Sequence, residues 1–244
     1  MIRIVAAKEI RMLFASPLAW IVLAIFQAIL AWIFLARLDA FLGVQARLQY
    51  LLNPPGVTQW ISAPLFSAAM MIFLMIIPLF TMRLVAEEVR NQTLTLLISA
   101  PISPVQIVIG KFLGLMVFLL AAIMLVLLMS LTLLAGGRLD FGLLFSNVLG
   151  LSLAAGGFSA LGLYISCLTK HPFLAGIGGI GALLGLWAVS FGTEKIGNAF
   201  QVLSPARHFE NFNQGLVDTG DIAYFILFIA LFLMLSVWRI GNLK

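Results

Sequence analysis

The stretch MRLVAEEVRNQTLTLLISAP, residues 82–101, places four charges within eight positions of a chain that has few of them. They are Arg83, Glu87, Glu88 and Arg90, whereas only 9% of the 244 residues are charged and 63% are hydrophobic. An average soluble domain carries about 25% charged residues, so folding alone cannot keep this chain's apolar surface out of water. The composition predicts an integral membrane protein in which the charged stretch is a loop outside the bilayer.

Six runs between charged residues approach the roughly 20 apolar residues that a membrane-crossing helix needs. Pro101 and Pro104 separate the charged loop from the run that follows it, because proline interrupts a helix. We expect an all-α protein with one transmembrane domain, residues 1–244. The predicted spans are residues 17–36, 61–84, 106–134, 143–168, 173–191 and 222–239.

Charge asymmetry orients these predicted spans. With both termini in the cytoplasm, the inner segments hold nine basic and three acidic residues, and the outer segments hold five basic and six acidic residues. Basic residues concentrate on the cytoplasmic side of membrane proteins, so this orientation is favoured. We expect a multi-pass protein of a bacterial cytoplasmic (inner) membrane with residues 82–101 inside.

Two inner segments have an amphipathic pattern. In residues 1–16, Arg3, Lys8 and Arg11 share one side of a helix, which predicts an interfacial elbow helix on the inner leaflet. Residues 86–99 also form an imperfect amphipathic helix on a helical projection, with Glu87 and Glu88 near its positive N-terminal end. From the residues alone, a solvated loop that only marks topology explains residues 86–99 equally well.

The segment AEEVRNQTLTLLISAPISPVQIVIGKFLG, residues 86–114, resembles the first cytoplasmic loop of ABC-2 type permeases, and the likeness extends over nearly the whole chain. The matching positions are Glu87, Glu88, Arg90, Thr93, Leu94, Leu97, Pro101, Gly110 and Lys111. Many members have glycine where this chain has Gln92, a departure that we expect only to stiffen the helix. In that family the loop is a coupling helix that docks on an ATPase subunit. The resemblance therefore implies a fold like that of type V exporters, with Gly110 and Lys111 at the start of span three.

The resemblance implies ATPase-coupling roles for the residues of this loop and a further ATPase contact through the N-terminal helix. The implied coupling residues are Arg83, Glu87, Glu88, Arg90, Asn91, Gln92, Thr93, Leu94 and Pro101.

The predicted outer loop before span six comprises residues 192–221. The stretch of residues 203–225, which runs from this loop into span six, is similar to the gliding-motility subgroup of these permeases, and a nitrous-oxide-reductase maturation permease has a similar layout. The residues that carry this likeness are Ser204, Pro205, His208, Phe209, Gly215, Asp218, Asp221 and Tyr224. His171 and His208 are the only histidines, and the predicted topology puts them on opposite faces, so we expect no metal site. A surface helix that starts at Ser204 and Pro205 explains the segment instead.

The motif GIGGIG, residues 176–181, matches the spacing of a dinucleotide-binding loop but lies inside predicted span five. Close helix packing by small residues explains it better. The packing positions are Gly176, Gly178, Gly179, Gly181 and Gly185. Gly110 and Gly114 form a second pair with the same four-residue spacing.

No Walker A sequence occurs in the chain, and the predicted spans hold no mid-span acid or histidine for ion coupling. We expect no enzymatic activity and no cofactor in this chain, with ATP and Mg²⁺ bound by two copies of an ATP-binding partner. The predicted function is the permease subunit of an ABC exporter, paired with an identical or related permease among membrane lipids, without nucleic acid. One alternative is a mechanotransmission subunit that acts on a periplasmic partner; a membrane-embedded enzyme is a remote one.

Overall fold

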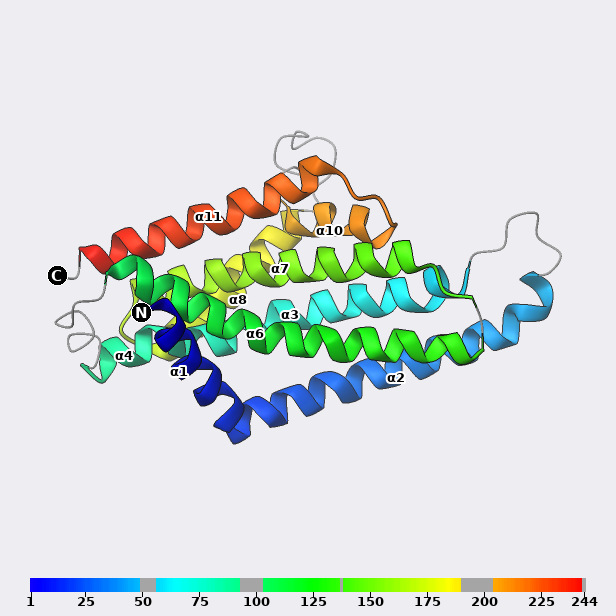
Figure 1. Cartoon of the computed structure of the whole chain (residues 1–244), viewed down its shortest axis with the longest axis horizontal. Coiled ribbons are helices and arrows are strands. Elements are labelled where there is room, and N and C mark those ends of the chain that lie inside the picture. Colours follow the sequence, from blue (N-terminus) through cyan, green and yellow to red (C-terminus); the bar gives the residue numbers. More distant parts are fainter. Residues whose placement is uncertain (49–55, 93–102, 137, 190–203, 243–244) are drawn as a thin grey trace.

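The computed structural model of the chain describes residues 1–48, 56–92, 103–136, 138–189 and 204–242, and all regular structure in these ranges is helical. Five helices are long and apolar enough to cross a membrane, and they lie roughly along one direction (Figure 1). These are α2 (Pro17–Leu48), α3 (Ala63–Leu84), α6 (Pro104–Leu131), α7 (Phe141–Leu168) and α11 (Thr219–Gly241).

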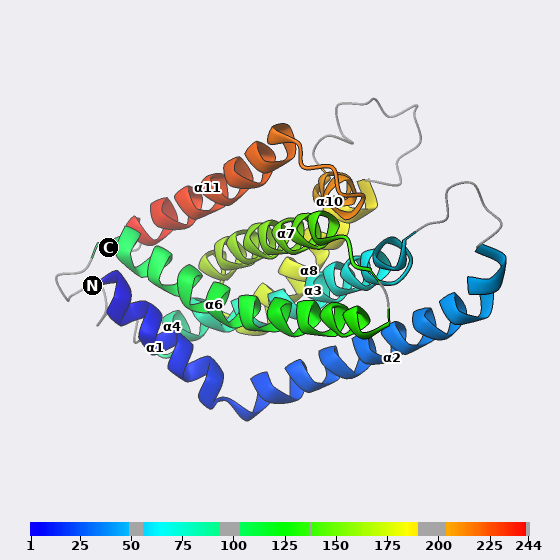
Figure 2. The ribbon, with the colours of Figure 1, turned by 45° about the vertical axis from the view of Figure 1, so that its right-hand side comes forward.

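Shorter helices complete the described fold. They are α1 (Ile2–Ala15), the π-turn η1 (Thr58–Ser62), α4 (Ala86–Arg90), the 3-10 turn η2 (Thr132–Ala135), α8 (Pro172–Ala188) and α10 (Pro205–Asn213). Both chain termini and α4 lie at one end of the bundle, which we call the terminal end (Figures 1 and 2). The N-terminal end of α7 lies toward the opposite end, and α10 packs beside it.

Local sequence signals explain where several helices begin. Ser103 and Gln106 form a reciprocal capping box at the start of α6, with Pro104 in its first turn. The Asp140 carboxylate accepts the backbone N–H groups of Gly142 and Leu143 at the start of α7, and Asp218 caps α11 in the same way through Gly220. Apart from α2, the long helices and α8 begin and end within three residues of the predicted spans.

The first span differs from its predicted range. We expected it to end near residue 36, but α2 continues as one helix to Leu48. The added segment, residues 37–48, consists mainly of good helix formers and contains no proline, so nothing in it forces a helix to stop. Residues 37–48 therefore continue the helix of span one. The proline break that follows, at residues 54–55, lies outside the described residues.

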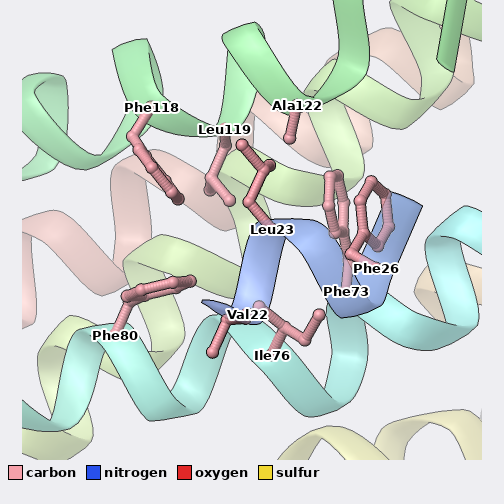
Figure 3. A pocket seen from close by; sticks show the side chains of 9 residues that line it. All are labelled: Val22, Leu23, Phe26, Phe73, Ile76, Phe80, Phe118, Leu119 and Ala122. Carbon is pink, nitrogen blue, oxygen red and sulfur yellow. The ribbon is translucent and has the colours of Figure 1, made fainter. Parts of the chain in front are cut away.

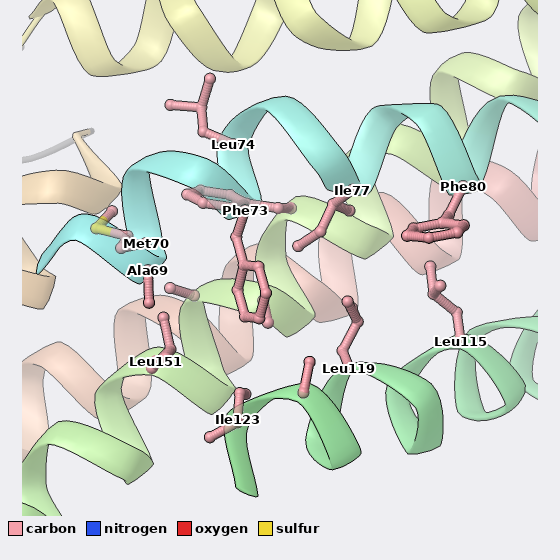
Figure 4. Close-up of a cluster of buried hydrophobic side chains, with 14 of the residues drawn as sticks. Ala69, Met70, Phe73, Leu74, Ile77, Phe80, Leu115, Leu119, Ile123 and Leu151 are labelled. Atoms are coloured by element: carbon pink, nitrogen blue, oxygen red, sulfur yellow. The ribbon is translucent and has the colours of Figure 1, made fainter. Parts of the chain in front are cut away.

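Helix α7 is the centre of the bundle. In its most apolar stretch 67% of the residues are buried, whereas the corresponding share is 17% in α2 and in α11, which lie at the periphery. Its small residues let neighbours approach closely: Gly150 faces Phe212 of α10, Gly156 faces Ile229 of α11, and Gly162 faces Thr81 of α3. Leucine, isoleucine and phenylalanine side chains fill the space among α3, α6 and α7 (Figure 4).

Helix α8 covers predicted span five but is short for a full crossing. Its 17 residues extend about 25 Å at ~1.5 Å per residue, against a hydrocarbon thickness of about 30 Å. Residues 190–203, which follow it, lie outside the described chain. The structure thus has five helices of spanning length, and six spans remain a prediction.

The glycines of the GIGGIG segment differ in what they face. Gly176 lies against Met82 and Gly179 against Pro78, so both let α8 approach α3. Gly178 faces Ile165 of α7. An added Cβ at Gly181 or Gly185 would meet no described atom within 4 Å, so these two glycines do not serve contact between the described helices.

The predicted helix over residues 86–99 is not continuous. Helix α4 ends at Arg90, and Gln92 has φ of 58°, in the left-handed region that no α-helix contains. Left-handed backbone costs a residue with a Cβ roughly 1–2 kcal/mol, which explains why glycine suits this position. Our expectation that Gln92 only stiffens a helical turn was wrong. Residues 93–99 lie outside the described chain.

This geometry predicts opposite effects for two substitutions that both remove the amide side chain. Gln92→Gly is expected to leave the protein more stable than Gln92→Val by about 1–2 kcal/mol, because only glycine adopts positive φ without strain. Thermal unfolding of the two purified variants in the same detergent measures the difference. Equal midpoints for the two variants would contradict the left-handed assignment.

Candidate functional site

Helix α1 approaches α6 more closely than an ordinary side-chain contact allows. A Cβ added at Gly110 would lie 2.7 Å from Cβ of Val5, and one at Gly114 would lie 2.6 Å from Cβ of Glu9. Each pair is spaced four residues apart, so one face of α1 fits the glycine face of α6. The expected interfacial helix is thus also packed on α6, with Val5 and Glu9 buried and Arg3 and Arg11 exposed.

Four charged side chains meet where α1, α4 and α6 converge, and we call Lys8, Glu9, Glu88 and Lys111 the ion cluster. Nζ of Lys111 lies 2.7 Å from Oε1 of Glu9 and 2.8 Å from Oε1 of Glu88. Nζ of Lys8 lies 3.3 Å from the same Glu88 oxygen. The side chains of Lys111 and Glu9 are 1% and 4% exposed, so this ion pair is inside the protein. Two acids balance two bases, which compensates the buried charge.

The ion cluster contains two residues that the resemblance had singled out. Lys111, at the start of span three, is buried between two carboxylates. Glu88, one of the implied coupling residues, binds Lys8 and Lys111 of the same chain through its Oε1. Glu9 was missed, although a lysine inside an apolar helix requires a counter-charge. That requirement was the available signal, because Glu9 is an acid in an otherwise basic N-terminal segment.

A serine of α7 fixes the junction between α3 and α4. The helix breaks at Val85, which has φ of −121° and ψ of −46°. Ser166 Oγ accepts the backbone N–H of Ala86 at 3.0 Å and that of Val85 at 3.3 Å, and the Ser166 hydroxyl donates to the Met82 carbonyl oxygen at 3.3 Å. Ser166 is fully buried and satisfies the N–H groups that the break leaves without helical partners. Helix α4 is thus held by α7 on one side and by the ion cluster on the other.

Several predicted coupling residues remain available on the surface of the terminal end. Arg83, Glu87, Arg90, Asn91 and Gln92 are exposed. Within the described part of the chain, Arg83, Glu87 and Arg90 form no ion pair. The other predicted coupling residues, Thr93, Leu94 and Pro101, lie outside the described residues.

The cavities differ in size and polarity. An apolar gap among α2, α3 and α6, beside the stacked rings of Phe26 and Phe73, has a volume of only about 10 Å³ and is too small for a ligand (Figure 3). A groove of about 180 Å³ lies between the α1–α2 elbow and the last turns of α3. A polar pocket of about 370 Å³ at the opposite end is lined by Gln59, Arg138, Asp140 and Gln214, among others.

The predicted outer-loop residues gather around the start of α11. His208 Nδ1 contacts Asp221 Oδ1 at 2.5 Å, and Asn211 Nδ2 donates to Asp221 Oδ2 at 2.9 Å. The His208 ring stacks on Tyr224 with centroids 4.0 Å apart. Phe209 of α10 is buried, and Pro205 is in the first turn of the same helix. Ser204 occupies the N-cap position, but its hydroxyl makes no capping hydrogen bond.

These contacts attach α10 to α11, and they differ from a metal site. The described residues contain no group of three or more histidine, cysteine, aspartate or glutamate side chains placed to hold a metal ion. Asp221, which we had placed among solvated outer charges, is 5% exposed and serves helix packing.

The pattern of spanning helices, a short basic N-terminal helix and a charged loop helix agrees with the comparison of the chain with known families. The model of the family described as ABC-2 family transporter protein matches residues 3–241. The chain belongs to the ABC-2 transporter family. No curated protein shows a significant match to it.

Membership of the ABC-2 family fixes the general class of the protein. ABC-2 proteins are the membrane components of ABC transporters, and they work with a separate ATP-binding subunit instead of hydrolysing ATP themselves. Together with five apolar helices of spanning length, this makes the chain a multi-pass membrane protein. In this ABC-2 chain, the buried charges of the ion cluster lie next to the exposed charged residues of α4.

Proposed function

We propose that this ABC-2 chain is the permease subunit of an ABC exporter and that α4, with the segment that follows it, receives the ATP-binding subunit. The observation that carries the proposal is the way α4 is held. Its Glu88 side binds α1 and α6, and its junction with α3 is capped by α7. The residues at the end of α4 and directly after it, Arg90, Asn91 and Gln92, are exposed and form the proposed docking surface.

The contacts of α4 define how a push on it reaches the spans. Helix α4 follows α3 directly, so a displacement moves the end of α3. The pair formed by Glu88 and Lys111 passes the displacement to α6, and the pair formed by Glu9 and Lys111 holds α1 to the same lysine. Rigid helices that are linked by buried contacts move as bodies, as in other switching proteins. A displacement of α4 is thus transmitted to α1 and α7 as well as to α3 and α6, which are spans two and three.

We place the terminal end in the cytoplasm of a bacterial cell, with six crossings of the inner membrane. Support comes from the basic bias of the inner segments and from the two termini at one end, which requires an even number of crossings (Figure 1). Helix α8 belongs to the sixth crossing in this arrangement. Two copies of the chain, or this chain and a related permease, form the pathway, with two ATP-binding subunits beneath them.

The polar pocket at the opposite end favours a second candidate function. Its volume of about 370 Å³ is in the usual range for a binding site, and an arginine, an aspartate and two glutamines line it. Such a surface suits an external protein partner, as mechanotransmission requires. The likeness of residues 203–225 to the gliding-motility subgroup is compatible with the same role.

Charge reversal at Arg90 tests the proposed docking surface. Arg90→Glu is expected to reduce the amount of ATP-binding subunit that co-purifies from native membranes at least tenfold, because an exposed charge then opposes the partner's surface. The co-purified subunit is identified by mass spectrometry as a polypeptide with a Walker A sequence. Arg138→Glu makes the same change at the exposed opposite end and is expected to retain the partner. Full retention with Arg90→Glu contradicts the docking assignment.

A further inference from the structure

The groove at the terminal end, which we call the elbow groove, continues from a charged rim to an apolar interior. Arg83 and Glu87 line it where α3 passes into α4. Deeper along α3 lie Leu79 and Phe80, and on the other side lie Leu18 and Ala19 of α2. Ala19 and Phe80 are buried and form its floor, whereas Leu18 and Leu79 are 41% and 37% exposed. In a membrane these exposed walls face acyl chains.

The two rim charges have no counter-charge within the described chain. The other two acids at this end, Glu9 and Glu88, are neutralised by Lys111 and Lys8. Arg83 and Glu87 are four residues apart on adjoining helical segments, but no ion pair joins them. They lie on either side of the helix break at Val85, and both line the groove. The rim therefore presents one cation and one anion at the level where α3 leaves the membrane.

We propose that the elbow groove binds a phospholipid with a zwitterionic primary-amine headgroup, namely phosphatidylethanolamine. Its phosphate takes the bidentate guanidinium of Arg83, and its ammonium group donates hydrogen bonds to the Glu87 carboxylate. One acyl chain lies along Leu79, Phe80 and Leu18. The headgroup thus offers one charge of the opposite sign to each rim residue.

This assignment separates the groove from the docking surface. The lipid takes Arg83 and Glu87, and Arg90, Asn91 and Gln92 are left to the ATP-binding subunit. The lining favours lipid over a protein segment because most of it is apolar and continues to the level of the acyl chains. A bound lipid also fills the space between the α1–α2 elbow and α3, so it stabilises the packing of α1 beside the ion cluster.

Lipid titration monitored by native mass spectrometry tests the proposal on the purified full-length chain. The probes are phosphatidylethanolamine, phosphatidylcholine and phosphatidylglycerol with identical acyl chains. The wild-type chain is expected to bind the ethanolamine lipid about tenfold more tightly than the other two, a ratio that corresponds to one good charge-assisted contact. The choline headgroup has no N–H to donate to Glu87, and the glycerol headgroup has no cation.

Three variants assign the selectivity to the groove. Glu87→Gln is expected to abolish the preference for ethanolamine over choline lipid, and Arg83→Gln to weaken binding of both about tenfold. Leu79→Trp, which blocks the apolar interior without changing a charge, is expected to weaken all three lipids. Arg90→Gln is the matched control and is expected to bind lipid as the wild type does.

Two results would overturn the proposal. One is failure of the expected selectivity: equal affinity of the three lipids for the wild-type chain, or a preference for the ethanolamine lipid that Glu87→Gln leaves intact. The other is a native complex with the ATP-binding subunit that carries no ethanolamine lipid, because the groove then belongs to that partner. Neither result depends on the docking role of Arg90, so the proposed function is tested separately.

Discussion

Replacing Lys111 with methionine is expected to lower the free energy of unfolding by about 3–5 kcal/mol, because it leaves Glu9 and Glu88 close together without their shared cation. The thermal midpoint of the detergent-purified chain should fall by about 10 °C, at roughly 2–4 °C per kcal/mol for a chain of this size. Helix α1 should separate from α6, because Lys111 is the charged contact between them.

Two comparisons show whether the loss comes from uncompensated charge. Lys8→Met removes a half-exposed member of the ion cluster, with 51% of its side chain exposed, and is expected to cost less than about 1 kcal/mol. Adding Glu9→Gln and Glu88→Gln to Lys111→Met removes the unpaired acids and should recover part of the stability. If Lys111→Met were no worse than Lys8→Met, the buried ion pairs would not exist as described.

The second large effect is expected at Gly162, where α7 meets α3. A Cβ added there would lie 2.3 Å from Oγ1 and 3.0 Å from Cβ of Thr81, so Gly162→Ala forces the two helices apart. Overpacking of this kind costs about 1–3 kcal/mol. Gly185→Ala is the matched substitution in open space and is expected to be neutral or to stabilise by up to about 1 kcal/mol, because alanine is the better helix former. Thermal unfolding of both variants gives the comparison.

A compensating change makes the Gly162 prediction specific. Thr81→Ala removes the hydroxyl and the methyl group that the new Cβ would meet, so Thr81→Ala with Gly162→Ala should be more stable than Gly162→Ala alone. Absence of this rescue, or equal midpoints for Gly162→Ala and Gly185→Ala, would contradict the close approach of α3 and α7.

The membrane-crossing helices could be predicted because the signal for each is local. A run without charge between two charged residues determines where a helix can lie in a bilayer, and caps such as Asp140 and Ser103 mark its start. The errors arose where no local residue decides the outcome. Helix α2 passes its expected end because residues 37–48 suit a helix as well as a loop, and α4 ends early through a left-handed residue that is not glycine.

The candidate site was less predictable because its contacts join distant parts of the chain. Lys111 and Glu9 are 102 residues apart, and Lys8 and Glu88 are 80 apart, so no spacing rule connects them. The resemblance to ABC-2 permeases pointed to the loop that contains Glu88 but could not show that Glu88 binds Lys8 and Lys111. The role of Ser166 could not be predicted, because serine is common in apolar helices. Only the fold shows that this serine lies beside the start of α4 and caps it.

Contact between an ATP-binding subunit and the exposed side of α4 can be measured by photo-cross-linking from position 90 in intact cells. Arg90 is replaced by p-benzoylphenylalanine, and the same replacement at Trp32, which is 76% exposed within α2, is the control. We expect a covalent adduct between position 90 and a polypeptide that carries a Walker A sequence, and no such adduct from position 32. If position 90 reaches no ATP-binding protein, or cross-links to a protein on the outer side of the membrane, α4 does not receive the ATP-binding subunit.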